Sequence, residues 1–166
     1  MITVVFCEEH NTVRKMLAEL FGRAGISYAF KNDPEAAGFA LVQPDGGAVF
    51  DVALCHSAAP GRVSAEYFTL INADDVKACK NDRGSIVITY GLNSLATAAA
   101  SSIEADGEEL KFQYCLQRNI ATLKGRIIEP QEFKVCIGKG GITIHDALAY
   151  VTLALIFNAP PELISF

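Results

Sequence analysis

The first half of the chain alternates short apolar runs with one strongly amphipathic segment. Residues 2–6 form a β-branched run that is typical of a buried strand. Apolar side chains then recur every three or four positions between Val13 and Ala24, which predicts a helix with one core-facing stripe. Gly25 supplies a natural end for that helix. The sequence therefore opens with a strand, a turn and a helix.

Further strands are predicted at residues 26–30, 48–54, 67–71 and 85–90. Residues 31–47 are rich in Pro, Gly, Asp and Ala, which predicts a loop with one short helix. Asn72, Asp74 and Asp75 follow the run 67–71, and such side chains favour a turn that caps a helix, here over residues 76–80. Strands that alternate with helices predict a mostly parallel sheet.

The second half of the chain changes to a period of two. Residues 110–116 alternate apolar and polar positions, and residues 132–137 repeat this pattern, as in an antiparallel meander. A closing helix follows, with Thr143 at its N-cap and Asp146 three positions later, as in a capping box. Its expected buried stripe consists of Ile144, Ala147, Leu148, Val151 and Leu155.

Together these patterns predict a three-layer α/β fold, with a mostly parallel sheet flanked by helices and an antiparallel β meander in the C-terminal half. We expect one domain over residues 1–166. Its parallel part covers residues 1–97, its antiparallel part residues 98–141, and its closing helix and tail residues 142–166.

The composition narrows the possible functions. The chain has 166 residues, of which 51% are hydrophobic and 20% charged, which indicates a globular protein. A net charge of −5 argues against nucleic acid as a partner. The N-terminus lacks the features of a signal peptide, and the longest apolar run is too short to span a bilayer. Five scattered cysteines and three dispersed histidines predict reduced thiols in the cytoplasm and no metal site.

Three segments together resemble the Mur ligases, the ATP-dependent amide ligases of peptidoglycan synthesis. One of them is FTLINADDVKACKNDRGSIVITYGLNSLATAAASSI, in which an Asn-Ala-Asp-Asp turn precedes a strand ending in Tyr-Gly. Another is GGITIHDALAYVTLALIFNAPPELI, which is similar to the helix that closes the family's central domain. The third, ITVVFCEEHNTVRKMLAELFGRAGI, is similar to the first strand, phosphate loop and first helix. The resemblance covers only the central, ATP-binding-type domain of that larger enzyme.

The phosphate loop that this resemblance implies is degenerate. The family's glycines and lysine fall on Phe6, Glu9 and His10, and Glu8 adds a further carboxylate. Glycine lets backbone N–H groups approach a phosphate closely, and lysine provides the opposing positive charge. A carboxylate ~4 Å from a phosphate instead costs about 1 kcal/mol per charge pair in water, and more in a less polar environment. Glu8 and Glu9 have a plainer role available, because they can satisfy the dipole of the following helix.

Asn11 and Thr12 occupy the positions of the hydroxyls that hold magnesium in the family, and they suit helix caps better than ligands. At the other end of the implied cleft, Ile142 and Thr143 replace the family's nucleotide-binding Gly-x-His-Asn ending.

The remaining candidates for a ligand cleft have structural alternatives as well. His56 is the sole candidate for the family's metal-binding histidine. Lys139 and the glycines after it could form an anion nest or a simple turn between strand and helix. Asn72, Asp74 and Asp75 suit turn chemistry better than ligand binding.

These departures predict a catalytically inactive, stand-alone relative of the Mur ligase central domain, which acts as a binding or regulatory module without a cofactor. One alternative is an ATP- and Mg-binding subunit of an acid–amino acid ligase, completed by partner chains. Another is a cleft in which His10, Asn11 and Thr12 bind a neutral or cationic small molecule. A central domain without its flanking domains would expose surface that they cover, and the mean hydropathy of the chain is +0.25, so we predict self-association or a protein partner. We expect neither nucleic acid nor membrane as a partner.

Overall fold

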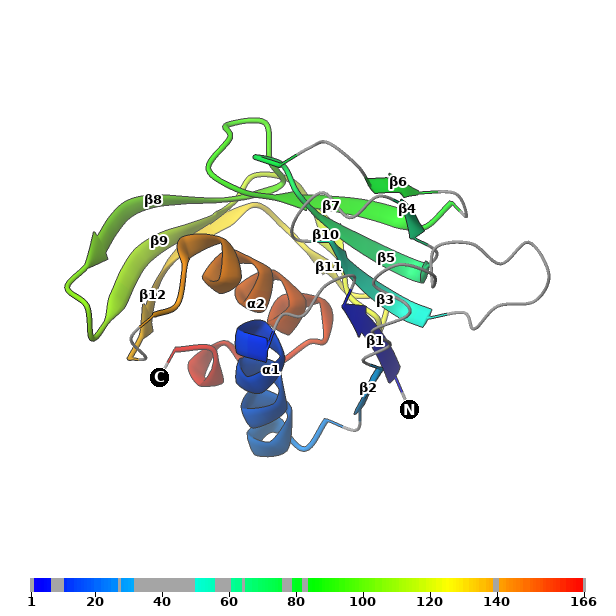
Figure 1. Cartoon of the computed structure of the whole chain (residues 1–166), viewed down its shortest axis with the longest axis horizontal. Coiled ribbons are helices and arrows are strands. Elements are labelled where there is room, and N and C mark those ends of the chain that lie inside the picture. The colour runs from blue at the N-terminus through cyan, green and yellow to red at the C-terminus, as the bar shows by residue number, and fades with distance from the viewer. Residues whose placement is uncertain are drawn as a thin grey trace.

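An eight-stranded mixed sheet organises the protein (Figure 1). The computed structural model describes residues 2–6, 11–26, 28–31, 50–55, 61–63, 65–75, 79–81, 84–138 and 141–165. The strand order is β12-β9-β8-β7-β5-β3-β1-β2. The strands of this sheet are β1 (Ile2–Phe6), β2 (Tyr28–Lys31), β3 (Phe50–Cys55), β5 (Ala65–Asn72), β7 (Ile86–Tyr90), β8 (Ala98–Ala105), β9 (Leu110–Leu116) and β12 (Gln131–Ile137).

The direction of pairing changes once across this sheet. All neighbouring pairs from β2 to β8 are parallel, whereas β8 with β9 and β9 with β12 are antiparallel. Two small ladders stand apart from the main sheet. In one, β4 (Gly61–Val63) pairs with β6 (Cys79–Asn81), and in the other, β10 (Ile120–Ala121) pairs with β11 (Ile127–Ile128). The predicted α/β fold, with a mostly parallel sheet and a C-terminal antiparallel meander, is confirmed.

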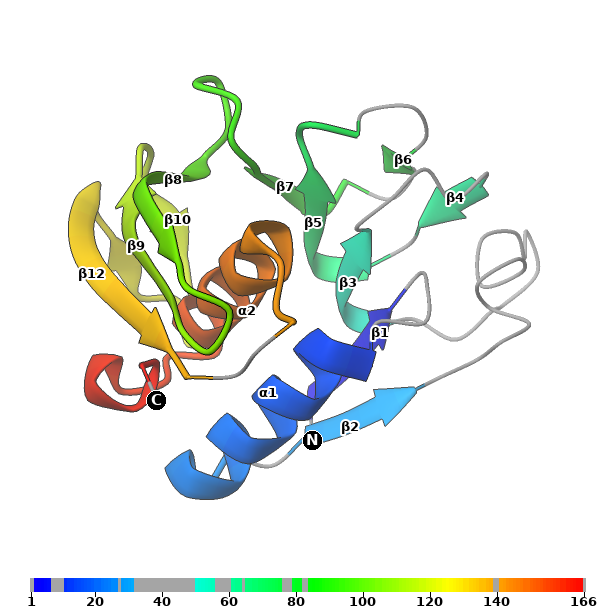
Figure 2. The same cartoon turned by 60° about the vertical axis from the view of Figure 1, so that its left-hand side comes forward.

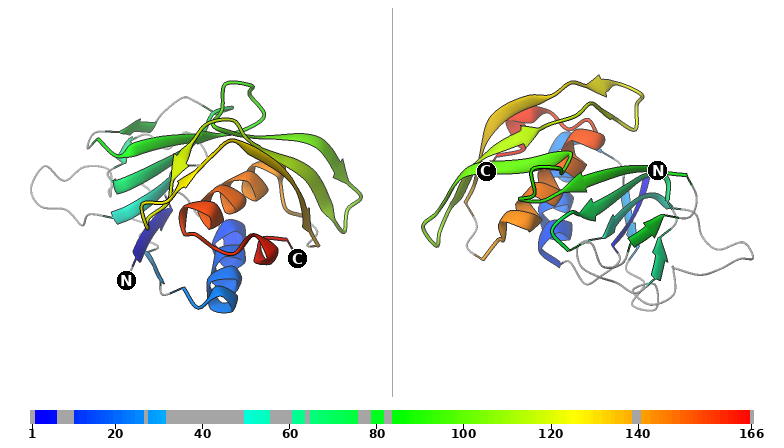
Figure 3. Two further views of the ribbon diagram at one scale, coloured as in Figure 1. Left: turned by 180° about the vertical axis from the view of Figure 1, so that it is seen from behind. Right: turned by 90° about the horizontal axis from the view of Figure 1, so that it is seen from above.

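Helices α1 (Asn11–Ala24) and α2 (Ile144–Ile156) lie together on the concave face of the curved sheet (Figures 1 and 3). The short helix η1 (Pro161–Leu163) follows α2. The opposite face of the central strands is buried too, since Ala53, Cys55 and Thr69 are at most 2% exposed. Burial on both faces explains the unbroken apolar run of residues 52–55 in β3.

The amphipathic pattern of α1 is confirmed. Val13, Met16, Leu17, Leu20 and Phe21 are buried, and the helix gives way at Gly25, whose φ of +64° suits glycine.

Helix α2 differs from the predicted stripe, because all its residues from Asp146 to Ile156 are buried. The helix lies between the sheet and α1, so tertiary packing covers its remaining sides (Figure 2). Aromatic side chains join the two helices, with the Phe21 and Phe157 ring centroids 4.5 Å apart. The hydroxyl of Thr152 donates to the Leu148 carbonyl at 2.7 Å, which satisfies a polar group in this apolar setting.

Some predicted boundaries need correction. The strand predicted at residues 26–30 is observed as β2, Tyr28–Lys31, because Ile26 belongs to the turn after α1, where its N–H bonds the Phe21 carbonyl. The helix predicted over residues 76–80 is wrong at its end, since Cys79 and Lys80 belong to β6. These two residues form a strand because they pair with β4, and no local sequence pattern indicates that pairing. Residues 32–49, which carry most of the predicted loop, lie outside the described residues.

Candidate functional site

The carboxyl ends of the parallel strands β5 and β7 bring several polar groups together. Asn72 at the end of β5 pairs with Tyr90 at the end of β7, and the Ala73 N–H donates to the Tyr90 carbonyl at 2.7 Å. The Asn72 side-chain oxygen accepts from the Asp74 N–H at 3.0 Å and so closes a tight turn. In α/β proteins ligands bind at the carboxyl ends of the parallel strands, so these polar groups form the candidate site.

Asp74 is the centre of this edge. One carboxylate oxygen, Oδ2, accepts from the Leu92 N–H at 2.6 Å, and Oδ1 accepts from the Asn93 N–H at 3.0 Å. Oδ2 also lies 2.8 Å from Nε2 of His145. An ionised carboxylate only accepts hydrogen bonds, so Nε2 carries the proton and donates it. We call Asn72, Asp74, Leu92, Asn93 and His145 the strand-end cluster.

The charge state of Asp74 follows from these contacts. Partial burial by itself would raise the pKa of its carboxyl group. Hydrogen bonds from the Leu92 amide, the His145 ring and the Asn93 amide outweigh burial, so the pKa is lower than usual. Asp74 is therefore ionised at neutral pH and brings a negative charge to the cluster.

Gly91 allows the β7–β8 loop to approach this carboxylate. A Cβ atom at position 91 would lie 2.7 Å from Oδ2 of Asp74, closer than real Cβ contacts occur, and the φ of +155° also favours glycine. The Tyr-Gly pair in the sequence thus corresponds to a close approach between the loop backbone and the Asp74 side chain.

The N-terminus of α2, which carries His145, is the last part of this candidate site. Thr143 Oγ1 accepts from the Asp146 N–H at 3.1 Å, and the Asp146 carboxylate accepts from the Thr143 N–H at 3.2 Å. This is the predicted capping box, which is confirmed. Thr143 Oγ1 also donates to the Asp146 carboxylate at 2.7 Å, so its hydroxyl is used within the cap.

The structure brings together only some of the candidates chosen from the sequence. Asn72 and Asp74 are in the strand-end cluster, Asp75 is half-buried in the same turn, and Thr143 lies two residues before His145. Asn11 is the first residue of α1, and Thr12 follows it, half-buried. The candidates that fall outside the described residues are Glu8, Glu9, His10, His56 and Lys139.

Sequence reasoning missed His145 and the two loop amides. His145 occupies the second position after the Thr143 cap, and a polar residue at a helix N-terminus opposite an Asn-x-Asp turn is the only signal that could have indicated it. The Leu92 and Asn93 amides are backbone groups, which a side-chain pattern cannot identify.

The charges of this edge limit its chemistry. Residues 72–75, 90–97 and 141–146 include three aspartates and one histidine, but no lysine or arginine.

Within the part of the chain that the structure describes, no group of three or more His, Cys, Asp or Glu side chains is arranged to hold a metal ion. Nor does any helix among those residues have the length and apolar character needed to cross a membrane.

Comparison with solved structures shows a Mur ligase-like α/β domain. One similar structure is the UDP-N-acetylmuramoylalanyl-D-glutamyl-2,6-diaminopimelate–D-alanyl-D-alanyl ligase from Acinetobacter baumannii, with a TM-score of 0.57 and 14% sequence identity over 98% of this chain. A crystal structure of MurF from the same organism gives a TM-score of 0.57 and 12% identity, again over 98% of this chain.

The chain spans less than half of those proteins, 44% and 43% of their respective lengths. No family model matches the sequence, and no curated protein matches it either. The likeness is therefore one of fold, and it supports the Mur ligase-like fold expected from the sequence.

Proposed function

We propose that this protein is a catalytically inactive relative of the Mur ligase central domain that acts by binding, as a cytoplasmic interaction or regulatory module. The observation that carries the proposal is the negative charge at the carboxyl ends of the parallel strands. Asp74 is ionised there, and residues 72–75, 90–97 and 141–146 contain no lysine or arginine that could face a polyphosphate.

The charge of the cluster disfavours a polyphosphate nearby. Asp74 is ionised and its carboxylate accepts three hydrogen bonds from neighbouring groups, so a phosphate bound at these strand ends would lie beside a fixed negative charge. Two like charges ~4 Å apart cost about 1 kcal/mol in water and about 4 kcal/mol at an effective dielectric of 20. Millimolar affinity amounts to only about 4 kcal/mol, so a few such repulsions remove it.

The degenerate phosphate loop supports the same proposal from the sequence. Glu8, Glu9 and His10 stand where the resemblance calls for glycines and a lysine. Acyl-phosphate ligation also requires aligned substrates in a site that excludes water, and in this family flanking domains provide these conditions.

The alternative function is an ATP-binding subunit of an acid–amino acid ligase connected with peptidoglycan synthesis. The observation that favours it is the coverage of 98% of this chain by the MurF fold. In that case partner chains would supply the remaining parts of the enzyme, with ATP and Mg as cofactors.

Isothermal titration calorimetry with Mg-ATP separates the two functions. We expect no heat of binding at nucleotide concentrations up to millimolar, whereas micromolar affinity would overturn the proposal in favour of the ligase subunit. The combined change Glu8→Gly, Glu9→Gly and His10→Lys should create measurable phosphate affinity. A folded triple variant that gains none would contradict the charge argument.

A further inference from the structure

Strand β12 is an edge strand of the main sheet. It pairs with β9 on one side, and its other side is the outer edge of the sheet (Figure 2). The N–H of Cys136 does not join the β9 ladder but donates to Oγ of Ser165 at 3.3 Å. In an antiparallel strand, the N–H and C=O groups of alternate residues point to the same side. The backbone groups of Glu132 and Lys134 therefore face the outer edge, together with those of Cys136.

At each end of this outer edge, the backbone has no N–H group available to a further strand. Pro130, before the strand, has no N–H to donate. At the other end, the N–H of Cys136 already bonds Ser165. Among the residues that the structure describes, Glu132 and Lys134 are thus the two residues of β12 whose N–H and C=O groups can both pair with a further strand.

A second copy of β12 matches this short edge in one register. If two copies pair antiparallel around a twofold axis at Phe133, Glu132 of each copy lies opposite Lys134 of the other. That register uses all four free N–H groups in four backbone hydrogen bonds. A register centred on Glu132 places Lys134 opposite Pro130, and one centred on Lys134 requires the engaged N–H of Cys136, so each loses bonds.

The charged side chains of β12 favour the same register, independently of the backbone hydrogen bonds. Glu132 and Lys134 are exposed, and their side chains share one face of β12. Their neighbours across the β9 ladder, Cys115 and Gln113, provide no opposite charge. Centring at Phe133 gives two Glu–Lys pairs across the axis, whereas the registers centred on Glu132 or Lys134 put two like charges face to face.

The axis residue supports the pairing as well. Phe133 is half-buried on the other face of β12, with its ring centroid 5.1 Å from that of Tyr114. Directly opposite residues on antiparallel strands have Cβ atoms about 5 Å apart, so Phe133 and its copy would extend this aromatic contact across the axis.

We propose that the protein forms a twofold symmetric dimer through β12, with the two main sheets joined at this edge and centred on Phe133. This goes beyond the proposed function, since it rests on the edge strand and not on the strand-end cluster. It identifies the expected partner as a second copy of this chain.

Charge-swap variants test the dimer by sedimentation velocity over micromolar concentrations. Glu132→Lys places two lysines opposite each other at both pairs, and Lys134→Glu places two glutamates there. Each variant should raise the dimer dissociation constant at least about tenfold. An equimolar mixture of the two variants should recover a dimer, because every pair across the axis is then complementary.

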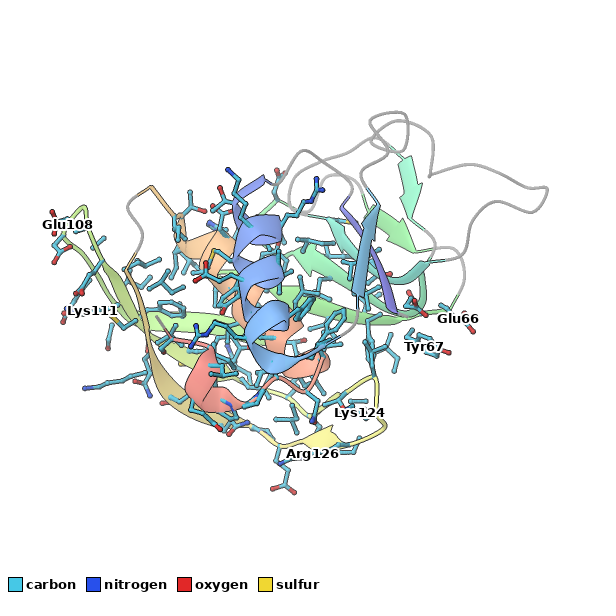
Figure 4. All side chains as sticks on the ribbon, turned by 90° about the horizontal axis from the view of Figure 1, so that it is seen from below. Glu66, Tyr67, Glu108, Lys111, Lys124 and Arg126 are labelled. Atoms are coloured by element: carbon cyan, nitrogen blue, oxygen red, sulfur yellow. The ribbon has the colours of Figure 1, made fainter. Side chains whose placement is uncertain are left out.

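Matched controls change the same charges elsewhere. Glu108 lies in the β8–β9 turn and Lys124 in the β10–β11 turn, far apart on the molecule, and both are exposed (Figure 4). Glu108→Lys and Lys124→Glu should dimerise like the original protein. A monomer at all concentrations overturns the proposal. So does a dimer whose affinity is the same in the swap variants and the controls, or a mixture that stays monomeric.

Discussion

Replacing Asp74 by alanine removes the group that ties β5 to the β7–β8 loop and to α2. The carboxylate accepts hydrogen bonds from the Leu92 and Asn93 amides and from the His145 ring. The turn bond from the residue 74 N–H to the Asn72 side chain does not need the Asp74 side chain and should persist. The variant therefore isolates the contribution of the carboxylate.

The expected cost follows from these three bonds. Hydrogen bonds to a charged group contribute about 1.5–3 kcal/mol each when buried. The Asp74 and His145 side chains are 28% and 27% exposed, so water replaces part of each bond and roughly 1 kcal/mol per bond remains. The free energy of unfolding should fall by about 2–3 kcal/mol, and the midpoint of thermal unfolding by about 5–10 °C.

Urea denaturation followed by circular dichroism measures this loss. Asp75→Ala is the matched control, because it removes a carboxylate from the same turn and should change stability by less than about 0.5 kcal/mol. If Asp74→Ala costs no more than Asp75→Ala, the cluster does not hold these elements together and our account of this edge is wrong.

Three further predictions concern the same edge. Gly91→Ala should destabilise by about 1–3 kcal/mol in urea denaturation, because its Cβ would lie 2.7 Å from Oδ2 of Asp74, and should cost less in the Asp74→Ala background. Thr143→Ala removes the cap of α2 and should cost about 1 kcal/mol in the same assay, whereas Thr143→Ser should cost less than half of that. The pKa of Asp74 is lowered in the folded protein, so its contribution is complete above the unfolded pKa near 4 and is lost as pH falls through the folded pKa. Acid titration of stability should therefore show a smaller loss below about pH 4 for Asp74→Asn than for the original protein; an identical loss would contradict this assignment.

Local sequence patterns determined much of the fold. Apolar side chains spaced three or four residues apart, as from Val13 to Phe21, lie on one side of the chain only in a helix. The period of two in residues 110–116 puts them on one side only in a strand, which then has a single core face. The Thr143–Asp146 cap also depends on neighbours only three positions apart, and it formed as predicted.

Local patterns of this kind gave wrong predictions where residues far apart in the sequence determine the structure. Helix α2 is buried on every side because the sheet and α1 enclose it, and no local pattern records such a neighbour. Cys79 and Lys80 adopt a strand because β4 pairs with them.

The candidate site shows the same division. The sequence by itself marked Asn72 and Asp74 as a polar turn after a buried strand, since short polar side chains there bond the nearby backbone. Tertiary structure decided what the Asp74 carboxylate does, because its partners Leu92, Asn93 and His145 are 18, 19 and 71 residues away along the chain. Only folding brings such groups within hydrogen-bonding distance, so their chemistry depends on the path of the whole sheet rather than on any short stretch of sequence.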